Sequence, residues 1–423
     1  MACIYTAKYL ISGDGPPLVG GALRDAAGRI AEVGPLAEVR RGNEQLRVVD
    51  FGEAILLPPL VNAHTHLELT DFPRWAGRGE ERREPADFVD WMLQVIRVKH
   101  AVPRENYLPS LCRGIELSLA AGTGAVGDIV SQLAARKAYR GSPLRGRIYL
   151  ETLGLDPAFT RNALQAIEAV LDQQTVGTMQ LGLAPHSPYT LSGEYLELLY
   201  RKCREQALFC TTHVAESKDE VDFLQRHGGA IGTKLYPFVG WQDRLGAAPG
   251  LRPIDYLQEQ GGLQPHNLLV HAVQLSRGEI DKVAAAGCPV VLCPRSNARL
   301  DVGTAPLREL LAAGVTLALG TDSLASCDSL SVWDELAFAA TRFAGQVDAP
   351  TLLRMATAGG AEALGLGKEL GLLRRGYRSS FQVLRPKRLP NRSELSDYLT
   401  SAGRSEEVEQ LCLDGSPVLP EAM

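Results

Sequence analysis

The chain has 423 residues, of which 45% are hydrophobic and 22% are charged, and its formal net charge is -5. This length allows one large domain with a sizeable core together with a small accessory domain. A slightly negative chain offers no basic field to a polyanion, so a small molecule is the expected ligand and nucleic acid is not.

The opening segment and the cysteines indicate the compartment. Residues 1–21 lack the basic start and long apolar run of a secretory leader, and no stretch reaches the ~18 apolar residues of a membrane span. The eight cysteines are scattered without a CxxC pair, which is typical of reduced thiols rather than of disulfides or a zinc ribbon. We therefore expect a cytoplasmic protein that has no membrane partner.

The two ends of the chain share one character. Residues 1–54 alternate short β-like runs with glycine and proline turns, and residues 368–423 return to this pattern. We expect these segments to form one small accessory β-domain, and residues 55–367 to form the main domain.

Within the main domain, short β-rich runs alternate with longer helical patterns. Apolar strands that are each followed by a helix are typical of a parallel sheet buried on both faces. Eight such units favour a closed (β/α)8 TIM barrel, an α/β fold, over an open sheet. The runs are 55–66, 122–129, 145–154, 179–188, 207–216, 267–275, 289–297 and 316–323.

Two connections between these runs are long. Residues 67–103 hold a charged stretch and then a helical pattern, and residues 228–265 are rich in glycine and proline. Connections of this length at the mouth of a barrel often act as lids. Trp91 in the first connection is a candidate to line the substrate pocket, and the alternative is that it packs this segment against the barrel wall.

Polar and titratable side chains stand near the C-terminal ends of the runs. In a (β/α)8 barrel these ends surround the active site, so side chains that are far apart in the sequence converge there. The set comprises His64, His66, Asp128, Glu151, His186, His213, His271, Asn297 and Asp322.

Four members of this set suit a metal ion. His64 and His66 are two residues apart on a strand, so both imidazoles point to the same face. With His213 and Asp322 they offer three nitrogen ligands and a carboxylate, a set that suits Zn2+ or Fe2+ with an open position for water. The fourth run ends in APHSPYT, with no lysine to bridge a second ion, so we expect one divalent metal ion per subunit.

Three residues are candidates for catalysis. Glu216 follows His213 by three residues, which places a carboxyl group beside the metal as a general acid or base. His271 would polarise the reacting centre, and Asp322 would accept the proton of a water molecule while it contacts the metal. The alternative for Glu216 is an acidic side chain that complements the dipole of the next helix.

Five motifs carry a family resemblance over essentially the entire chain. NAHTHLELT, HVAES, LLVHAVQLS, CPRSN and GTDSLAS, in this order, resemble the deaminase and chlorohydrolase branch of the amidohydrolase superfamily. The resemblance implies a metal-dependent hydrolase with one metal ion, held and assisted by the six residues just described. It also implies that the terminal segments fold into a β-sandwich.

The resemblance also implies contacts with a substrate. His186 in APHSPYTLS matches the histidine with which nucleoside deaminases touch their substrate, often its ribose, and Ser326 matches another pocket position. The alternative for His186 is a turn cap before the next helix. Glu68 in HTHLELT, followed by FVDWMLQVI, is most similar to the aminodeoxyfutalosine deaminases of menaquinone biosynthesis. These enzymes replace the 6-amino group of an adenine by oxygen and release ammonia.

Other functions share the same metal site. They include deamination of S-adenosylhomocysteine, methylthioadenosine or guanine, and hydrolysis of a chlorinated or aminated triazine. A noncatalytic relative is a further alternative, but every expected metal and proton-transfer residue is present, which argues against it. Because relatives are often dimers, a second copy of the chain is also a candidate partner.

Overall fold

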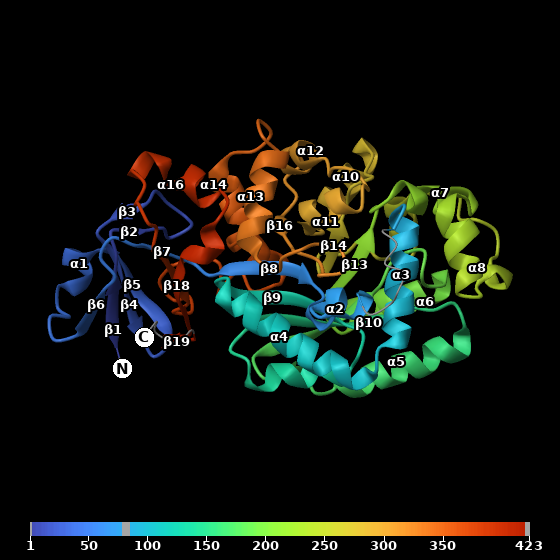
Figure 1. The fold of residues 1–423 in the computed structure, drawn as a ribbon, viewed down its shortest axis with the longest axis horizontal. Helices are drawn as coiled ribbons and strands as arrows, with labels where there is room; N and C mark the ends of the chain where they lie inside the picture. The colour runs from blue at the N-terminus through green and yellow to red at the C-terminus, as the bar shows by residue number, and fades with distance from the viewer. Residues whose placement is uncertain (1, 78–84, 419–423) are drawn as a thin grey trace.

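The structure of the protein is a computed structural model that describes residues 2–77 and 85–418. It shows a large barrel surrounded by helices and, at one end, a smaller unit of β-strands in which both termini lie (Figure 1). The sequence-based expectation of a TIM barrel with additional sheets from the terminal segments is confirmed.

The barrel consists of eight strands that pair in parallel, in the order β16-β15-β14-β13-β12-β10-β9-β8. A parallel bridge between Thr65 and Asp322 joins the first strand to the segment after the last one. The sheet therefore closes on itself beside the predicted metal ligands. The barrel strands are β8 (Leu60–Thr65), β9 (Thr123–Val130), β10 (Arg145–Thr152), β12 (Met179–Pro185), β13 (Cys210–Val214), β14 (Asn267–His271), β15 (Val290–Leu292) and β16 (Leu317–Leu319), and a short strand β11 (Thr175–Val176) pairs with β12.

Several helices begin at side-chain caps, each of which contributes about 1 kcal/mol to helix stability. The side chain of Ser192 accepts from the backbone N–H of Tyr195 at the start of α6, and Ser276 and Glu279 form a capping box at the start of α10. The helices are α1 (Leu36–Arg40), α2 (Phe72–Ala76), α3 (Phe88–Ala101), α4 (Tyr107–Ala120), α5 (Pro157–Leu171), α6 (Gly193–Glu205), α7 (Lys218–Arg226), α8 (Tyr236–Phe238), α9 (Pro253–Glu259), α10 (Arg277–Ala286), α11 (Pro294–Arg299), α12 (Leu307–Ala312), α13 (Val332–Arg342), α14 (Ala349–Met355), α15 (Ala358–Ala363) and α16 (Leu395–Leu399).

The terminal segments form two sheets that pack face to face. Leu10 and Phe381 from one sheet and Leu23 from the other share a buried apolar cluster, so burial of this cluster holds the sheets together. The first sheet has the order β5 (Arg29–Pro35), β4 (Gly21–Ala26), β1 (Cys3–Thr6), β6 (Arg47–Asp50), and the second has the order β19 (Ser416–Pro417), β18 (Val408–Leu413), β17 (Phe381–Leu384), β7 (Ile55–Leu57), β2 (Tyr9–Leu10), β3 (Leu18–Val19).

The run 55–66, expected as a single barrel strand, is divided into two strands. Its first part is β7, which pairs with β17 and β2 of the terminal unit, and only its second part, β8, belongs to the barrel. Pro58 and Pro59 lie between them. Since proline has no N–H to donate to a sheet, the two prolines separate the strands.

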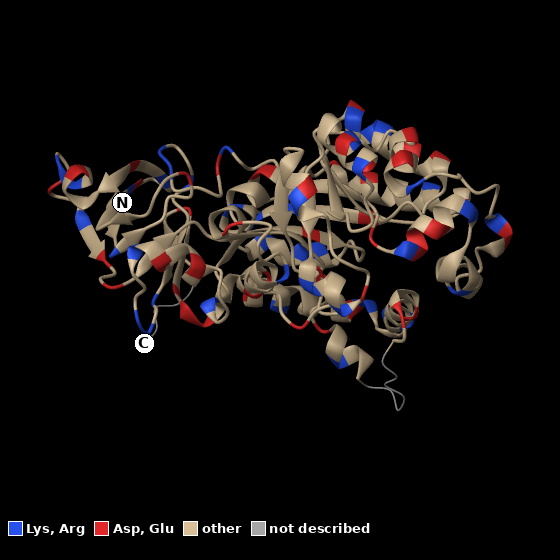
Figure 2. Cartoon of the chain, turned by 90° about the horizontal axis from the view of Figure 1, so that it is seen from above, with Lys and Arg blue, Asp and Glu red and all other residues tan. Residues whose placement is uncertain are grey.

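Charged side chains of both signs are distributed over the whole molecule. Lys and Arg alternate with Asp and Glu along the outer helices and loops (Figure 2), in keeping with the small net charge of -5. Among the described residues, no helix is long and apolar enough to cross a membrane.

Candidate active site

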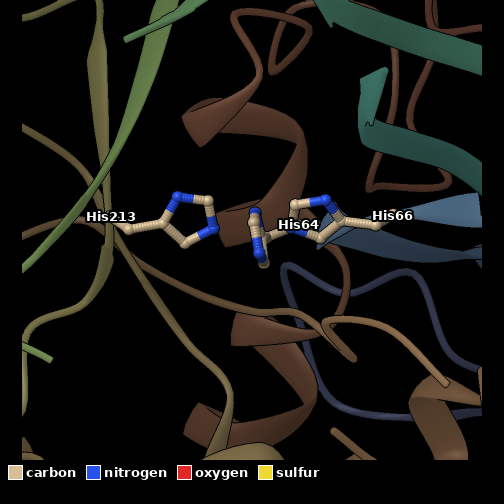
Figure 3. Close-up of side chains that lie close together, drawn as sticks. All are labelled: His64, His66 and His213. Carbon is tan, nitrogen blue, oxygen red and sulfur yellow. The ribbon is translucent and has the colours of Figure 1, made fainter. Parts of the chain in front are cut away.

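The barrel brings three histidines together at one end of its strands. His64 and His66 come from the end of β8 and His213 from β13, and their ligand atoms lie within 4.8 Å of one another. Figure 3 shows the three rings side by side, with His64 in the centre of the view. Oδ1 of Asp322 lies 3.6 Å from Nε2 of His64 and 3.6 Å from Nε2 of His66. The four predicted metal ligands therefore form one cluster.

The chemistry of this cluster fits a divalent metal ion. Nε2 of His64 is buried and has no hydrogen-bond partner among the described residues, and an unpaired buried nitrogen is costly unless something binds it. Burial lowers the pKa of His66 to about 3 and that of His213 well below its usual range. Both imidazoles are therefore neutral, which is the form that binds metal.

A second set of contacts orients the ligands. Nδ1 of His213 donates to the backbone oxygen of His186 at 2.9 Å, which turns Nε2 of His213 toward the cluster. The hydroxyls of Ser296 and Ser326 each donate to Oδ2 of Asp322 at 2.7 Å, leaving Oδ1 free. Burial alone would raise the pKa of Asp322, but the nearby histidines hold it well below its usual range.

Glu216 and His271 stand beside the cluster. Oε1 of Glu216 lies 3.4 Å from Nε2 of His271, and Nδ1 of His271 lies 2.9 Å from Oδ1 of Asn297. Because an amide oxygen can only accept, Nδ1 carries the proton and Nε2 faces Glu216. Burial, and then the charge of Asp322, raise the pKa of Glu216 well above its usual range, so Glu216 can hold a proton at neutral pH.

Glu220 fixes the backbone that carries Glu216. Its Oε1 accepts from the N–H of Ala215 at 2.9 Å and its Oε2 accepts from the N–H of Glu216 at 2.8 Å. Ala215 has a φ of 53°, a left-handed conformation that is strained for a residue with a Cβ and is found often at functional sites. The carboxylate of Glu220 therefore stabilises a strained turn at the end of β13.

A cavity of about 800 Å³ opens at the cluster. His66, His213, Glu216, His271 and Asp322 line one end of it. Side chains from α3, from α5, from residues 235–241 and from the segments that follow several barrel strands also line it. Both long connections of the sequence thus contribute to its walls, although residues 78–84 of the charged stretch lie outside the described residues.

The predicted substrate contacts divide into two groups. Trp91 and His186 line the cavity, and Nε1 of Trp91 also donates to the backbone oxygen of Ala325 at 2.9 Å. Glu68 and Ser326 are not among its lining residues. We expected both to touch the substrate, but Ser326 contacts Asp322, and Glu68 accepts from Ser131 and from the N–H of Gln132.

Two charged residues of the cavity wall, Lys99 and Glu151, were not singled out from the sequence as substrate contacts. Lys99 had a recognisable signal, because Trp91, Val95 and Lys99 recur every four residues along α3 and so share one face of the helix. All three line the cavity.

Arg145, Arg147 and Arg295 of the barrel do not line the cavity. Arg145 is paired with Asp414, and Arg147 donates to the backbone oxygen of Leu364 while it stacks over Phe209. Arg295 is paired with Asp328. Among the described residues, no arginine lines the cavity.

Comparisons with known proteins give a family match and several relatives. A sequence model described as "Amidohydrolase family" matches residues 55–418. The chain is 33% identical to an aminodeoxyfutalosine deaminase of Deinococcus radiodurans, covering 86% of this chain and 85% of the relative. It is 29% identical to a 5-methylthioadenosine/S-adenosylhomocysteine deaminase of Syntrophobacter fumaroxidans, covering 96% and 90%. A solved adenosine deaminase from Xanthomonas campestris with bound zinc is 26% identical, with a TM-score of 0.77 and coverage of 98% and 92%.

Proposed function

The chain belongs to the amidohydrolase family, whose members include metal-dependent hydrolases of carbon–nitrogen bonds, and we propose that it deaminates an adenine-type nucleoside, with aminodeoxyfutalosine as its substrate. The observation that carries this proposal is the pairing of Glu216 with His271 beside the four predicted metal ligands, in the wall of a cavity of about 800 Å³. This reaction would place the protein in menaquinone biosynthesis.

His64, His66, His213 and Asp322 would hold the ion, and the three nitrogens and one oxygen suit Zn2+ or Fe2+. The zinc in the solved relative supports zinc as the first candidate. When bound, the ion supplies an acidified water as the nucleophile.

The residues of the chain move the protons of the reaction. Oδ1 of Asp322 accepts the proton that water loses as its oxygen attacks the carbon bearing the amino group. Glu216, which burial keeps protonated, donates a proton to the adjacent ring nitrogen. His271, held by Asn297, faces Glu216 and the reacting centre. Asp322 then passes its proton to the amino group, and the carbon–nitrogen bond breaks so that ammonia leaves. The new hydroxyl on the carbon returns a proton to Glu216, which gives the oxo product.

The cavity supports a nucleoside that carries a further group. A volume of about 800 Å³ lies in the range of sites that hold drug-sized ligands, so it exceeds the needs of a free base. Phe159, Phe238 and Trp241 line the part away from the metal cluster, which suits an apolar 5′ substituent. By their names, the two relatives in the sequence comparison deaminate aminodeoxyfutalosine and 5-methylthioadenosine or S-adenosylhomocysteine.

Methylthioadenosine is the second candidate substrate. Aminodeoxyfutalosine carries a carboxylate, whereas the described part of the cavity has no arginine, and its one lysine, Lys99, is already paired with Glu151. This observation favours an uncharged 5′ group. The greater identity to the aminodeoxyfutalosine deaminase, 33% against 29%, favours the first candidate.

Ammonia release by the metal-loaded protein tests the proposal. The panel is aminodeoxyfutalosine, methylthioadenosine, S-adenosylhomocysteine, adenosine and guanine, compared by kcat/KM. We expect the highest value with aminodeoxyfutalosine, by at least about tenfold, which corresponds to ~1.4 kcal/mol of transition-state binding. A higher kcat/KM with methylthioadenosine would make that nucleoside the substrate and would leave the assignment as a deaminase unchanged. No ammonia from any of the five would overturn the proposed function.

A further inference from the structure

Lys99 and Glu151 form an ion pair in the wall of the cavity. Nζ of Lys99, in the last turn of α3, lies 3.5 Å from Oε2 of Glu151 at the end of β10. Both residues line the cavity, and only 6% of the Glu151 side chain is exposed. The reaction proposed above uses neither of them.

The carboxylate of Glu151 has unused acceptor capacity. Among the described residues, no backbone N–H or hydroxyl donates a hydrogen bond to it, and Lys99 is its one partner. By contrast, the buried carboxylates of Glu68 and Glu220 each accept two or more hydrogen bonds. Since an ionised carboxylate has about four acceptor positions and is normally satisfied when buried, Glu151 has room for donors from a ligand.

Glu151 lies next to the metal end of the cavity rather than the apolar end. Tyr149, two residues earlier on β10, belongs to the cluster that fills the barrel, so Glu151 points to the same side. Glu151 pairs across the sheet with Ala184, two residues before His186. The ring of His186 in turn lies 5.0 Å from that of His213. In a bound nucleoside, the carbon that bears the amino group would lie at the metal cluster. The ribose attached to the base would then lie near Glu151.

The Lys99–Glu151 pair favours uncharged hydrogen-bond donors of a ligand over charged groups. Lys99 balances the charge of Glu151, so the pair as a whole attracts neither a free anion nor a cation strongly. Burial raises the pKa of Glu151, but Lys99, His186 and His66 lower it to about 2 overall. Glu151 is therefore an acceptor at neutral pH, and two adjacent hydroxyls are the neutral group that a carboxylate binds through both oxygens.

We propose that Glu151 binds the 2′ and 3′ hydroxyls of the ribose, with Lys99 as the residue that positions its carboxylate. This inference rests on the proposed function and extends it, because it makes the enzyme selective for ribonucleosides over 2′- and 3′-deoxynucleosides. A hydrogen bond to a charged group contributes ~1.5–3 kcal/mol, which is a preference of about 10- to 100-fold.

Binding of product nucleosides tests the inference independently of turnover. The metal-loaded protein is titrated calorimetrically with inosine, 2′-deoxyinosine and 3′-deoxyinosine. We expect the wild-type protein to bind inosine about 10- to 100-fold more tightly than either deoxy analogue. Glu151→Gln should reduce this preference to a few-fold. Glu194→Gln, the same chemical change at an exposed position of α6, is the matched control and should keep the preference.

Lys99→Met tests the role of the lysine. It should also reduce the preference for inosine, because Glu151 loses the partner that orients it. A Lys99→Met protein that keeps this preference but loses affinity only for carboxylate-bearing nucleosides would overturn the inference and make Lys99 an anion-binding residue. Equal binding of the three nucleosides by the wild type, an unchanged preference in Glu151→Gln, or no binding of any of them would also overturn it.

The ammonia assay keeps this inference distinct from the proposed function. Deamination of the panel substrates without a ribose preference would contradict the role of Glu151 alone. Absence of deamination would contradict the proposed function, whatever the binding data show.

Discussion

The two ends of the cavity are built in different ways. At the metal end, buried side chains from the ends of the barrel strands hold one another through hydrogen bonds, as Ser296 and Ser326 hold Asp322. The far end comes from connections, and there Phe159 and Phe238 are 58% and 43% exposed. The comparison indicates that the rigid sheet fixes the chemistry, whereas the longer connections set which molecule reaches it.

Glu216→Gln should give the largest effect and tests the metal end. We expect kcat to fall by about 10²- to 10⁴-fold, because proton transfer by a general acid contributes on this scale. Metal content, measured by elemental analysis, should remain at the wild-type level because Glu216 is not a ligand. An unchanged kcat would show that Glu216 takes no part in the reaction, and loss of metal would show that Glu216 contributes to binding of the ion.

Ser326→Ala tests whether the outer contacts at the metal end act through the metal ligand. Removal of its hydrogen bond to Asp322 should reduce metal affinity or kcat by about 10- to 100-fold. The KM should change little, because Ser326 does not line the cavity. An increase in KM alone would instead indicate that Ser326 contacts the substrate directly, as the sequence suggested.

Asp128→Asn tests the rigidity of the metal end through stability. Asp128 accepts from the N–H of Leu67, directly after His66, and from Tyr139. Burial raises its pKa from 3.8 to about 8. Between these two pKa values the folded state keeps a proton on Asp128 that the unfolded state loses. The resulting stabilisation is fully present below the unfolded pKa and is lost as the pH rises through the folded pKa. The unfolding free energy falls by at most about 1.4 kcal/mol per pH unit over this range.

The variant has no such proton, so its unfolding free energy should fall less steeply than that of the wild type between about pH 5 and 8. Urea unfolding at several pH values measures the two slopes. Parallel curves for Asp128→Asn and the wild type would show that Asp128 is already ionised in the folded protein.

Phe159→Ala should give the smallest effect and tests the far end. Because Phe159 is 58% exposed, its removal should raise KM only a few-fold, as expected for a partly buried apolar contact of about 1 kcal/mol. The increase should appear with substrates that carry an apolar 5′ group and be absent with adenosine. A large fall in kcat would contradict the division between the two ends.

The convergence of the side chains at the metal end could be predicted from the sequence because barrel geometry constrains it. Once eight strands were recognised, the ends that carry His64, His213 and Asp322 had to meet, whatever their separation along the chain. Barrel geometry did not, however, predict where the first barrel strand begins. The run 55–66 was expected as one strand, although Pro58 and Pro59 divide it between the terminal unit and the barrel.

Contacts made by the connections were predicted less well, because the paths of these segments depend on tertiary packing. The pairing of Lys99 with Glu151 joins α3 to β10, and no sequence period specifies such a contact. Glu68 shows that a local motif does not give the partners of a side chain. The motif predicts a contact with the substrate, and in the structure the carboxylate of Glu68 accepts hydrogen bonds from Ser131 and Gln132.

Stoichiometric reconstitution with metal tests most directly the central claim that one ion at the strand ends supports deamination. Zinc or ferrous iron is added in steps to chelator-treated protein, and ammonia release from the best nucleoside of the panel is followed. We predict no activity without metal, a linear rise, and a plateau at one equivalent per subunit, with no recovery in a His213→Ala variant. Full activity of the metal-free protein, or a plateau at two equivalents, would contradict the account.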